Sequence, residues 1–331
     1  MHTHIFFEVS EWERPQLKKL FPHALLVNEQ LTPDTAGEYP HATHISTFIY
    51  SSLNEEVLKK MPHLRIVTTR STGYDHIDLQ ACRARNVVVC NVPEYGTHTV
   101  AEHTFALILT LSRRMHTAVE QARKFDFNHD DIRGFDLFGK TIAVIGLGKI
   151  GTEVARIAHG FGMKIVTSSS CRDEAFSASL NIKHTDFDAA LAAADIVTLH
   201  VPYSAKTHHL INEQACRTMK KGSYLINTAR GGIVDTQALF NAIESKHLGG
   251  AGLDVFEQEE QLMEELSVLS GLRPQGYDYK TLLLDHLLVR HPNVIVTPHN
   301  AFNSDEALSN ILEVTCENLQ AFDRGEAQNS L

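Results

Sequence analysis

The stretch Thr141-Ile142-Ala143-Val144-Ile145-Gly146-Leu147-Gly148-Lys149-Ile150-Gly151 decides the fold class of this chain. Residues 141–145 form an apolar, partly β-branched run, which predicts a buried strand. Glycines then follow with the spacing G-x-G-x-x-G, and residues 150–161 carry the pattern of a helix. A strand, a glycine-rich turn and a helix in this order are typical of the first unit of a doubly wound α/β domain.

Each glycine of this turn has its own expected role in binding phosphate. Gly146 permits the tight turn, Gly148 lets the backbone approach a pyrophosphate, and Gly151 lets the helix pack on the strand. The N-terminus of the helix then offers N–H groups and a partial positive charge to the phosphates. We therefore predict that Gly146, Gly148, Lys149, Ile150 and Gly151 bind a dinucleotide. The alternative is an ordinary glycine-rich turn.

The residues after the next expected strand bear on the choice between NAD and NADP. Residues 164–167 run into Ser168-Ser169-Ser170-Cys171-Arg172, without the Asp or Glu that would bind the ribose 2′-hydroxyl of NAD. Serine hydroxyls and a nearby arginine suit a 2′-phosphate instead. The sequence thus predicts NAD(P), with a lean to NADP(H) through Ser169 and Arg172. Alternatively, Arg172 is a solvated surface residue and NAD is used.

Strand-like and helix-like segments alternate along the chain, which predicts parallel sheets flanked by helices. The expected strands are 4–9, 45–50, 66–69, 87–90, 141–145, 164–167, 196–200, 224–227, 250–254 and 294–297. They form two sets, separated by one long amphipathic helix over 97–116. Residues 262–290 interrupt the alternation and are expected to form a surface insertion of helix and loop.

The two sets of strands predict two domains in the 331 residues. The last helix, 304–324, follows the second set, and we expect it to pack back on the first domain. We therefore expect a substrate-binding domain formed by 1–98 with 300–331. A dinucleotide-binding domain would occupy 99–299.

Composition excludes several classes of protein. A net charge of −10 without a basic tail argues against nucleic acid or an anionic membrane as a partner. The longest apolar runs, such as 105–111, are too short to cross a bilayer, and the N-terminus lacks the features of a signal peptide. The five cysteines are scattered without C-x-x-C spacing, which favours reduced thiols in the cytoplasm.

Twenty histidines raise the hypothesis of a metal site. The closest groupings are His208-His209, and His286 near His291. Neither has the spacing of a known ligand motif, so no metal site is expected from them.

Three further motifs follow expected parallel strands, at the ends where open α/β sheets bind ligands. They are Asn227-Thr228-Ala229-Arg230-Gly231-Gly232, Gly252-Leu253-Asp254-Val255-Phe256-Glu257-Gln258-Glu259 and Thr297-Pro298-His299-Asn300-Ala301-Phe302. Reduction of a 2-keto acid needs a cation for the carboxylate and carbonyl, a proton donor, and a carboxylate that favours the protonated donor. Arg230, His299 and Glu259 fit these roles. Taken singly, each could instead be a salt-bridge partner, a loop cap or a solvated charge.

At these motifs the sequence resembles the D-isomer-specific 2-hydroxyacid dehydrogenase family, and most closely its D-lactate dehydrogenase branch. The resemblance covers about residues 45–302. Besides the glycine turn and the three motifs above, it includes Arg70-Ser71-Thr72-Gly73-Tyr74-Asp75-His76-Ile77-Asp78, Ala101-Glu102-His103-Thr104 and His200-Val201-Pro202. The family implies an α/β protein of two Rossmann-like or flavodoxin-like parallel-sheet domains, with the active site in the cleft between them.

The resemblance also implies roles for individual residues. Arg230 would bind the substrate carboxylate and carbonyl, His299 would be the acid/base paired with Glu259, and Asp254 would hold the nicotinamide carboxamide. The other residues implied for the cofactor site are His200, Val201, Pro202, Thr228 and Ala229. Those implied for the substrate site are the backbone N–H groups of Thr72 and Gly73 and the aromatic side chains of Tyr50, Tyr95 and Phe302.

Two residues depart from the family pattern, and two alternative functions remain open. Ser169 stands where many relatives carry Asp, and Asn300 follows the expected catalytic histidine, where other residues are common. The first alternative is that the chain is a glyoxylate/hydroxypyruvate reductase of the same superfamily. A nicotinamide-sensing scaffold like the C-terminal-binding-protein corepressors is an alternative of another class. We also expect a homodimer through 101–115, because apolar residues surround much of that helix.

Overall fold

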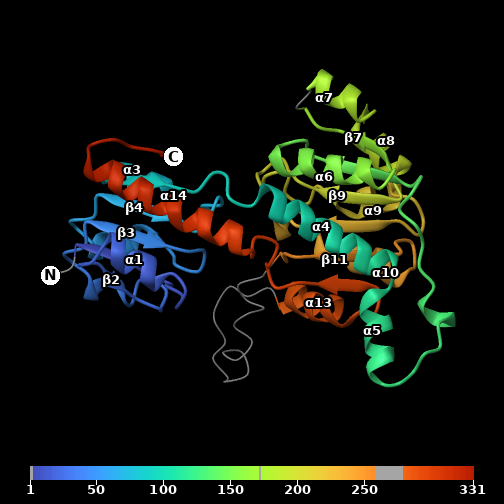
Figure 1. Cartoon of the computed structure of the whole chain (residues 1–331), viewed down its shortest axis with the longest axis horizontal. Helices are drawn as coiled ribbons and strands as arrows, with labels where there is room; N and C mark the ends of the chain where they lie inside the picture. The colour runs from blue at the N-terminus through green and yellow to red at the C-terminus, as the bar shows by residue number, and fades with distance from the viewer. Residues whose placement is uncertain (1–2, 171–172, 258–278) are drawn as a thin grey trace. The chain divides into compact units, whose positions relative to one another are not determined.

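The computed structural model describes residues 3–170, 173–257 and 279–331. The chain divides into two compact units, Met1–Gly96 with Asn303–Leu331 and Thr97–Phe302 (Figure 1). This division falls within a few residues of the boundaries expected at 98/99 and 299/300. Each unit is built on a parallel sheet, which confirms the predicted fold class of two parallel-sheet α/β domains.

The first unit contains a five-stranded parallel sheet in the order β2-β1-β3-β4-β5. The strands are β1 (His4–Phe6), β2 (Leu25–Leu26), β3 (His44–Thr47), β4 (Ile66–Thr69) and β5 (Val88–Cys90). Its helices are α1 (Arg14–Leu20), η1 (Ala36–Glu38), α2 (Glu55–Lys60), α3 (Leu79–Ala84) and α14 (Asp305–Asp323). Helix α14 begins at its N-cap Ser304 and packs against β4, so the last helix of the chain belongs to this unit (Figure 1).

Both faces of this sheet are apolar because its strands are covered on both sides. Ile5, Ile45 and Val67 stand in register on neighbouring strands and belong to one buried cluster. Phe6 and Ile66 point to the other face, where they pack with side chains of α14. Apolar residues that point to both faces, such as Ile66 and Val67 of β4, are typical of a parallel strand covered on both sides.

The second unit contains a seven-stranded parallel sheet in the order β12-β11-β10-β9-β6-β7-β8. The strands are β6 (Thr141–Ile145), β7 (Lys164–Thr167), β8 (Lys183–His184), β9 (Ile196–Leu199), β10 (Tyr224–Asn227), β11 (Gly250–Leu253) and β12 (Val294–Val296). The chain runs outward from β6 to β8 and then returns to pair β9 with the other side of β6. The order therefore reverses between β6 and β9, and ligands bind at such switch points in open α/β sheets.

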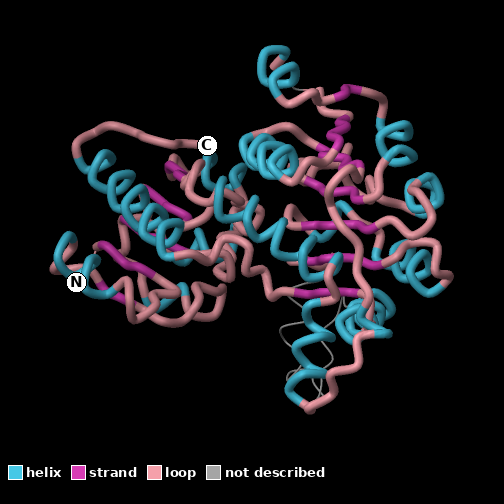
Figure 2. The backbone as a smooth tube through the Cα atoms, turned by 45° about the vertical axis from the view of Figure 1, so that its right-hand side comes forward, coloured by secondary structure: helices cyan, strands magenta, loops and turns pink. Residues whose placement is uncertain are grey.

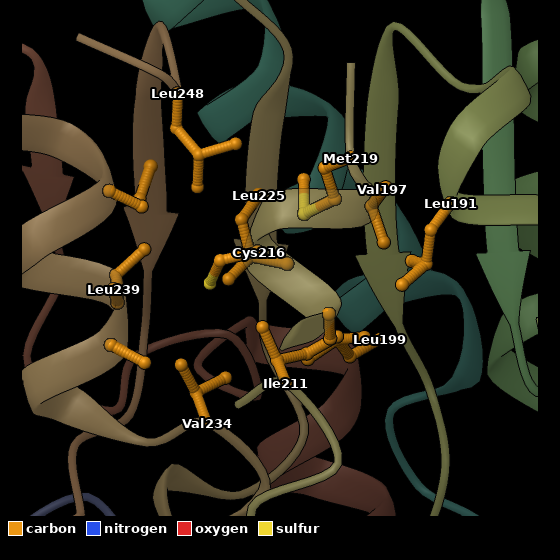
Figure 3. Close-up of a cluster of buried hydrophobic side chains, with 14 of the residues drawn as sticks. Leu191, Val197, Leu199, Ile211, Cys216, Met219, Leu225, Val234, Leu239 and Leu248 are labelled. Carbon is orange, nitrogen blue, oxygen red and sulfur yellow. The ribbon is translucent and has the colours of Figure 1, made fainter. Parts of the chain in front are cut away.

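Helices cover both faces of this sheet (Figure 2). The described helices of this unit are α4 (Thr97–Ser112), α5 (Met115–Arg123), η2 (Asp130–Ile132), α6 (Lys149–Gly160), α7 (Glu174–Ser179), α8 (Phe187–Ala193), α9 (Glu213–Thr218), η3 (Gly231–Ile233), α10 (Thr236–Glu244) and α13 (Tyr279–Arg290). On one face, α4 and α6 bury side chains against Ile142, Val144 and Ile226. On the other, residues such as Val197, Leu199 and Leu225 pack with side chains from the α9 and α10 region (Figure 3).

Four of the expected segments need correction. The single helix over 97–116 is wrong, because Arg114 has a left-handed backbone (φ 46°) that separates α4 from α5. The strands expected over 4–9 and 45–50 end three residues early, at Phe6 and Thr47. The insertion over 262–290 was expected on the surface, but its end is α13, which buries Leu282, Leu284 and Leu288 against the core. Residues 258–278 lie outside the described part of the chain.

None of the helices formed by the described residues is long and apolar enough to cross a membrane.

Candidate functional site

The glycine-rich turn connects β6 to α6 beside the switch point of the second sheet. Gly146 has φ 101°, and a Cβ added there would lie 2.6 Å from the carbonyl oxygen of His200. A Cβ on Gly151 would lie 1.9 Å from the carbonyl oxygen of Gly146, so both positions require glycine. A Cβ on Gly148 would meet nothing within 4 Å. Gly148 therefore leaves open space at the start of α6, where an anion can approach the helix N-terminus.

Ser169 links the end of β7 to this turn. Its hydroxyl oxygen accepts the backbone N–H of Leu147 at 3.0 Å, and its own N–H donates to the Thr167 hydroxyl at 3.1 Å. The Thr167 hydroxyl in turn donates to the carbonyl of Val144 at 2.7 Å. The predicted cofactor residue Ser169 thus also fixes the glycine turn. Its predicted partner Arg172 lies outside the described residues.

His200, Val201 and Pro202 follow β9, the strand on the other side of the switch point. The His200 N–H donates to the carbonyl of Ile145 at 2.8 Å, and the Val201 side chain closes on Gly146. Desolvation lowers the pKa of His200 to about 3, so its imidazole is neutral at physiological pH. The loops after β6 and β9 therefore contact each other at the place where a dinucleotide is expected.

The loop that carries Arg230 follows β10 and is fixed by the side chain of Asn227. The Asn227 amide donates to the carbonyl of Arg230 at 2.9 Å and accepts the N–H of Ala229 at 3.0 Å. The Thr228 hydroxyl lies 3.0 Å from that of Thr104 on α4. These bonds hold the backbone around Arg230, whose guanidinium donates to the carbonyl of Ala229 at 2.7 Å.

Asp254 follows β11 and organises the loop that carries His299 after β12. The N–H of His299 donates to the Asp254 carbonyl at 2.9 Å. The Asp254 carboxylate accepts the N–H groups of Asn300 at 2.8 Å and Ala301 at 2.9 Å, and the hydroxyl of Thr297. His299 itself has φ 49°, a conformation that non-glycine residues rarely adopt.

Asp254 remains a carboxylate although it is buried. Burial alone would raise its pKa, but hydrogen bonds from His103, from Thr297 and from the N–H groups of Asn300 and Ala301 bring the pKa below its ordinary value. The Nε2 atom of His103 lies 3.4 Å from the carboxylate and 3.0 Å from the Thr297 hydroxyl. The sequence motifs contain His103 and Thr297 but do not indicate this role.

Strands β10, β11 and β12 are neighbours, so the loops of Arg230, Asp254 and His299 leave the same edge of the sheet. The ring of Phe302 lies edge-on to that of His299, with centroids 6.4 Å apart. The second unit thus gathers the predicted cation, proton donor and cofactor residues at one edge. Glu259, the predicted partner of His299, lies outside the described residues.

The predicted substrate residues of the first unit also follow neighbouring strands, β3, β4 and β5. Glu8, which the sequence did not reveal, holds the backbone of the Tyr50 loop: its carboxylate accepts the N–H of Tyr50 at 2.9 Å. The Thr72 hydroxyl donates to the carbonyl of Val92 at 2.7 Å, and Gly73 accepts the Ser71 hydroxyl at 2.6 Å. Tyr95 lies in the loop after β5 and is half-buried.

Comparison with known proteins extends over both units. Residues 105–301 match the sequence profile of the D-isomer specific 2-hydroxyacid dehydrogenase, NAD binding domain. A D-lactate dehydrogenase of Curvularia clavata is 36% identical over 89% of this chain and 82% of its own. A glyoxylate reductase of Korarchaeum cryptofilum is 37% identical over 84% of this chain and 79% of its own. The structure of D-lactate dehydrogenase from Aquifex aeolicus, complexed with NAD and lactic acid, matches with TM-score 0.88 and 37% identity, over 98% of this chain and 96% of that one.

Proposed function

The chain belongs to the D-isomer-specific 2-hydroxyacid dehydrogenase family and is an oxidoreductase with a nicotinamide cofactor, and from this premise we propose that it interconverts pyruvate and D-lactate. The observation that carries the proposal is the row of loops after β10, β11 and β12, which presents Arg230, Asp254 and His299 at one edge of the cofactor-binding sheet. A cation, a buried carboxylate and an imidazole are the groups that reduction of a 2-keto acid requires.

In the proposed reaction the protein binds the keto acid and supplies the proton. The planar guanidinium of Arg230 binds the carboxylate through paired N–H donors and polarises the carbonyl next to it. The imidazolium of His299 donates its proton to the carbonyl oxygen as that oxygen becomes a hydroxyl. When bound, the nicotinamide cofactor supplies the hydride for the carbonyl carbon. The reverse direction requires neutral imidazole, which accepts the hydroxyl proton.

The glycine turn fits the cofactor that this chemistry needs. Gly148 leaves open space at the N-terminus of α6, and Gly146 lies at the switch point of the sheet. We propose that Asp254 orients the carboxamide of the nicotinamide as well as the His299 loop. Glu259, Tyr50, Thr72, Gly73 and Tyr95 stay predictions for the acid/base pair and the substrate contacts.

The choice of substrate is tested by initial rates on pyruvate, 2-ketobutyrate, hydroxypyruvate and glyoxylate. We expect the highest kcat/KM with pyruvate. The second candidate function is that of a glyoxylate/hydroxypyruvate reductase. It is supported by the glyoxylate reductase of K. cryptofilum, whose 37% identity to this chain is similar to the 36% of the C. clavata D-lactate dehydrogenase. A clear preference for glyoxylate or hydroxypyruvate would favour that candidate.

For the cofactor we propose that NADPH serves at least as well as NADH. The support is Ser169 at the end of β7, where a carboxylate would select NAD. The same initial-rate series, run with both cofactors, tests this proposal separately from the choice of substrate.

We also propose a homodimer, although not for the reason that the sequence offered. Phe105, Leu107, Ile108 and Leu111 of α4 are buried within their own unit, so they leave no apolar face for a second copy. Among the described residues, the three most exposed large apolar side chains lie in the loops between α5 and β6, where Phe125, Phe127 and Phe138 are 87%, 75% and 80% exposed. Light scattering at micromolar concentration should give twice the chain mass; a monomer mass would refute the dimer.

We propose that the protein works in the cytoplasm. Its described cysteines, Cys82, Cys90, Cys216 and Cys316, are free and buried, which suits a reducing compartment.

A further inference from the structure

Two histidines and an aspartate converge in the first unit, outside the site described above. His4 on β1 and His44 on β3 stand directly opposite each other in the register of the sheet. Their rings are stacked, with centroids 4.2 Å apart and planes 12° apart. The Asp323 carboxylate at the end of α14 lies 3.5 Å from Nε2 of His4 and 3.1 Å from Nε2 of His44. One ligand atom from each residue lies within 4.8 Å of the other two.

Both Nε2 atoms are buried, yet neither makes a hydrogen bond among the described residues. A buried polar nitrogen without a partner costs free energy and is rare in folded proteins. The Asp323 carboxylate faces both nitrogens, at 3.5 Å from Nε2 of His4 and 3.1 Å from Nε2 of His44. One group that contacts both rings and the carboxylate would satisfy both nitrogens together.

The environment of His44 indicates the chemistry of that group. The Thr43 hydroxyl has one hydrogen and two neighbours, the carbonyl oxygen of Thr3 at 3.2 Å and Nδ1 of His44 at 2.7 Å. Because the carbonyl only accepts, the consistent assignment has Thr43 donating to Thr3 and Nδ1–H of His44 donating to Thr43. Nε2 of a neutral His44 is then a lone pair that faces Asp323. Two electron pairs that face each other repel, and a cation between them would turn this repulsion into attraction.

The neutral imidazole is the form of histidine that binds metal ions. The His44 side chain is 8% exposed, so it is held in a buried position beside the carboxylate. Its Nδ1 is fixed by a second residue, as is usual for a histidine ligand.

We propose that His4, His44 and Asp323 bind a divalent transition-metal ion of the zinc class. Two imidazole nitrogens and one carboxylate suit Zn²⁺, whereas Mg²⁺ and Ca²⁺ prefer oxygen ligands. In a tetrahedral zinc site with bonds of about 2.0–2.2 Å, neighbouring ligand atoms lie roughly 3.3–3.6 Å apart. The distances of 3.5 Å and 3.1 Å from the Asp323 carboxylate to Nε2 of His4 and of His44 are close to that spacing. Asp323 is 45% exposed in its side chain, which leaves a route for the ion and room for a water ligand.

The ion would join three segments that are distant in the sequence. It would connect β1 and β3 to the end of α14, the helix that returns to the first unit after the whole second unit. Phe21 and Phe322 stand beside the two imidazoles, with centroids 5.7 Å from His4 and 5.5 Å from His44, and limit their movement. The site would therefore stabilise the folded first unit rather than take part in hydride transfer.

The experiment measures Zn²⁺ binding to the chelator-treated full chain by competition with a chromophoric chelator, and the change in Tm on adding Zn²⁺. The variants are Asp323→Asn, at an exposed position that tolerates change, and His4→Ala. The matched control is His63→Ala, since His41 and His63 form another stacked pair, with centroids 6.1 Å apart, on the surface of the same unit. His2→Ala controls for binding by the amino-terminal residues.

The wild type, His63→Ala and His2→Ala should each bind one Zn²⁺ and gain Tm. Asp323→Asn and His4→Ala should bind it at least about tenfold more weakly and gain less Tm, with unchanged circular dichroism and turnover. Co²⁺ bound in the same site of the wild type should give the absorption spectrum of a tetrahedral site with nitrogen and oxygen ligands. Asp323→Asn and His4→Ala should not show this spectrum. Absence of stoichiometric binding in the wild type, or equal binding in Asp323→Asn and His4→Ala, would overturn the proposal.

Discussion

The backbone N–H of His299 donates to the carbonyl of Asp254 at 2.9 Å, so the proposed proton donor is held by a residue of the neighbouring strand. The Asp254 carboxylate, 1% exposed, also accepts the N–H groups of Asn300 and Ala301. These bonds stabilise the left-handed backbone of His299 (φ 49°), which costs about 1–3 kcal/mol in a non-glycine residue. The position of the imidazole therefore depends on Asp254.

The substitution Asp254→Asn tests this dependence. It removes the negative charge and places an NH₂ donor where N–H groups need an acceptor, which costs about 1–3 kcal/mol for each group left unsatisfied. We expect kcat to fall on the order of 10- to 100-fold, with a lower Tm. Steady-state kinetics and thermal unfolding measure both effects. A folded variant with wild-type kcat would show that His299 does not need this support.

Two glycines of the same turn should respond differently to alanine. Gly148→Ala adds a methyl group to open space, so the fold should keep its Tm while the methyl group obstructs the phosphates. Gly151→Ala places its Cβ against the carbonyl of Gly146, so stability itself should fall. Fluorescence titration with NADH and NADPH, together with thermal unfolding, separates the two. Unchanged cofactor affinity in Gly148→Ala would place the pyrophosphate elsewhere.

Ser169 offers a test of the proposed cofactor preference. Ser169→Asp introduces a carboxylate that repels a 2′-phosphate and accepts the ribose 2′-hydroxyl of NAD. The ratio of kcat/KM with NADPH to kcat/KM with NADH should fall roughly 10- to 150-fold. This fall corresponds to the loss of about 1.5–3 kcal/mol for a charge-assisted contact to the phosphate. Ser169→Ala is the control, because losing the bond to Leu147 should weaken both cofactors alike. Arg172→Ala should lower NADPH use alone. A wild type that strongly prefers NADH would contradict the proposal.

The lowered pKa of His200 predicts a specific loss of stability in acid. Its pKa is about 3 in the folded chain, against 6.5 for an ordinary histidine. Between these two pKa values, His200 is protonated in the unfolded chain but not in the folded chain. Its contribution to the free energy of unfolding is therefore complete above pH 6.5 and declines as pH falls toward 3. Urea unfolding at pH 7 and pH 5 measures this loss. The free energy of unfolding should change less between the two pH values in His200→Asn than in the wild type. His63→Ala, at the surface, should match the wild type.

The sequence predicted best what depends on local pattern. Buried parallel strands read as apolar runs, and the glycine spacing places a phosphate-binding turn after β6. It could not reveal the break at Arg114, because α4 and α5 together read as one periodic helix. The two-residue strands β2 and β8 leave no pattern at all.

Contacts between distant residues were also beyond the sequence. His4, His44 and Asp323 meet only because β1 pairs with β3 and α14 returns to the first unit, so no spacing rule could join them. The same holds for the Asp254 carboxylate, which accepts hydrogen bonds from three residues of the loop after β12. That loop lies more than forty residues further along the chain, at Thr297, Asn300 and Ala301. Motifs identify reactive residue types, whereas their supporting hydrogen bonds emerge from strand order.

The central claim is that His299 supplies the proton in reversible reduction of a 2-keto acid. Its most direct test is the turnover of wild type and His299→Ala in both directions, pyruvate with NAD(P)H and D-lactate with NAD(P)⁺. Loss of acid/base catalysis should lower kcat by roughly 10²–10⁴-fold in both directions. Cofactor affinity should stay unchanged, because Gly146 to Gly151 are untouched. Full activity of His299→Ala with either pair of substrates would contradict the account.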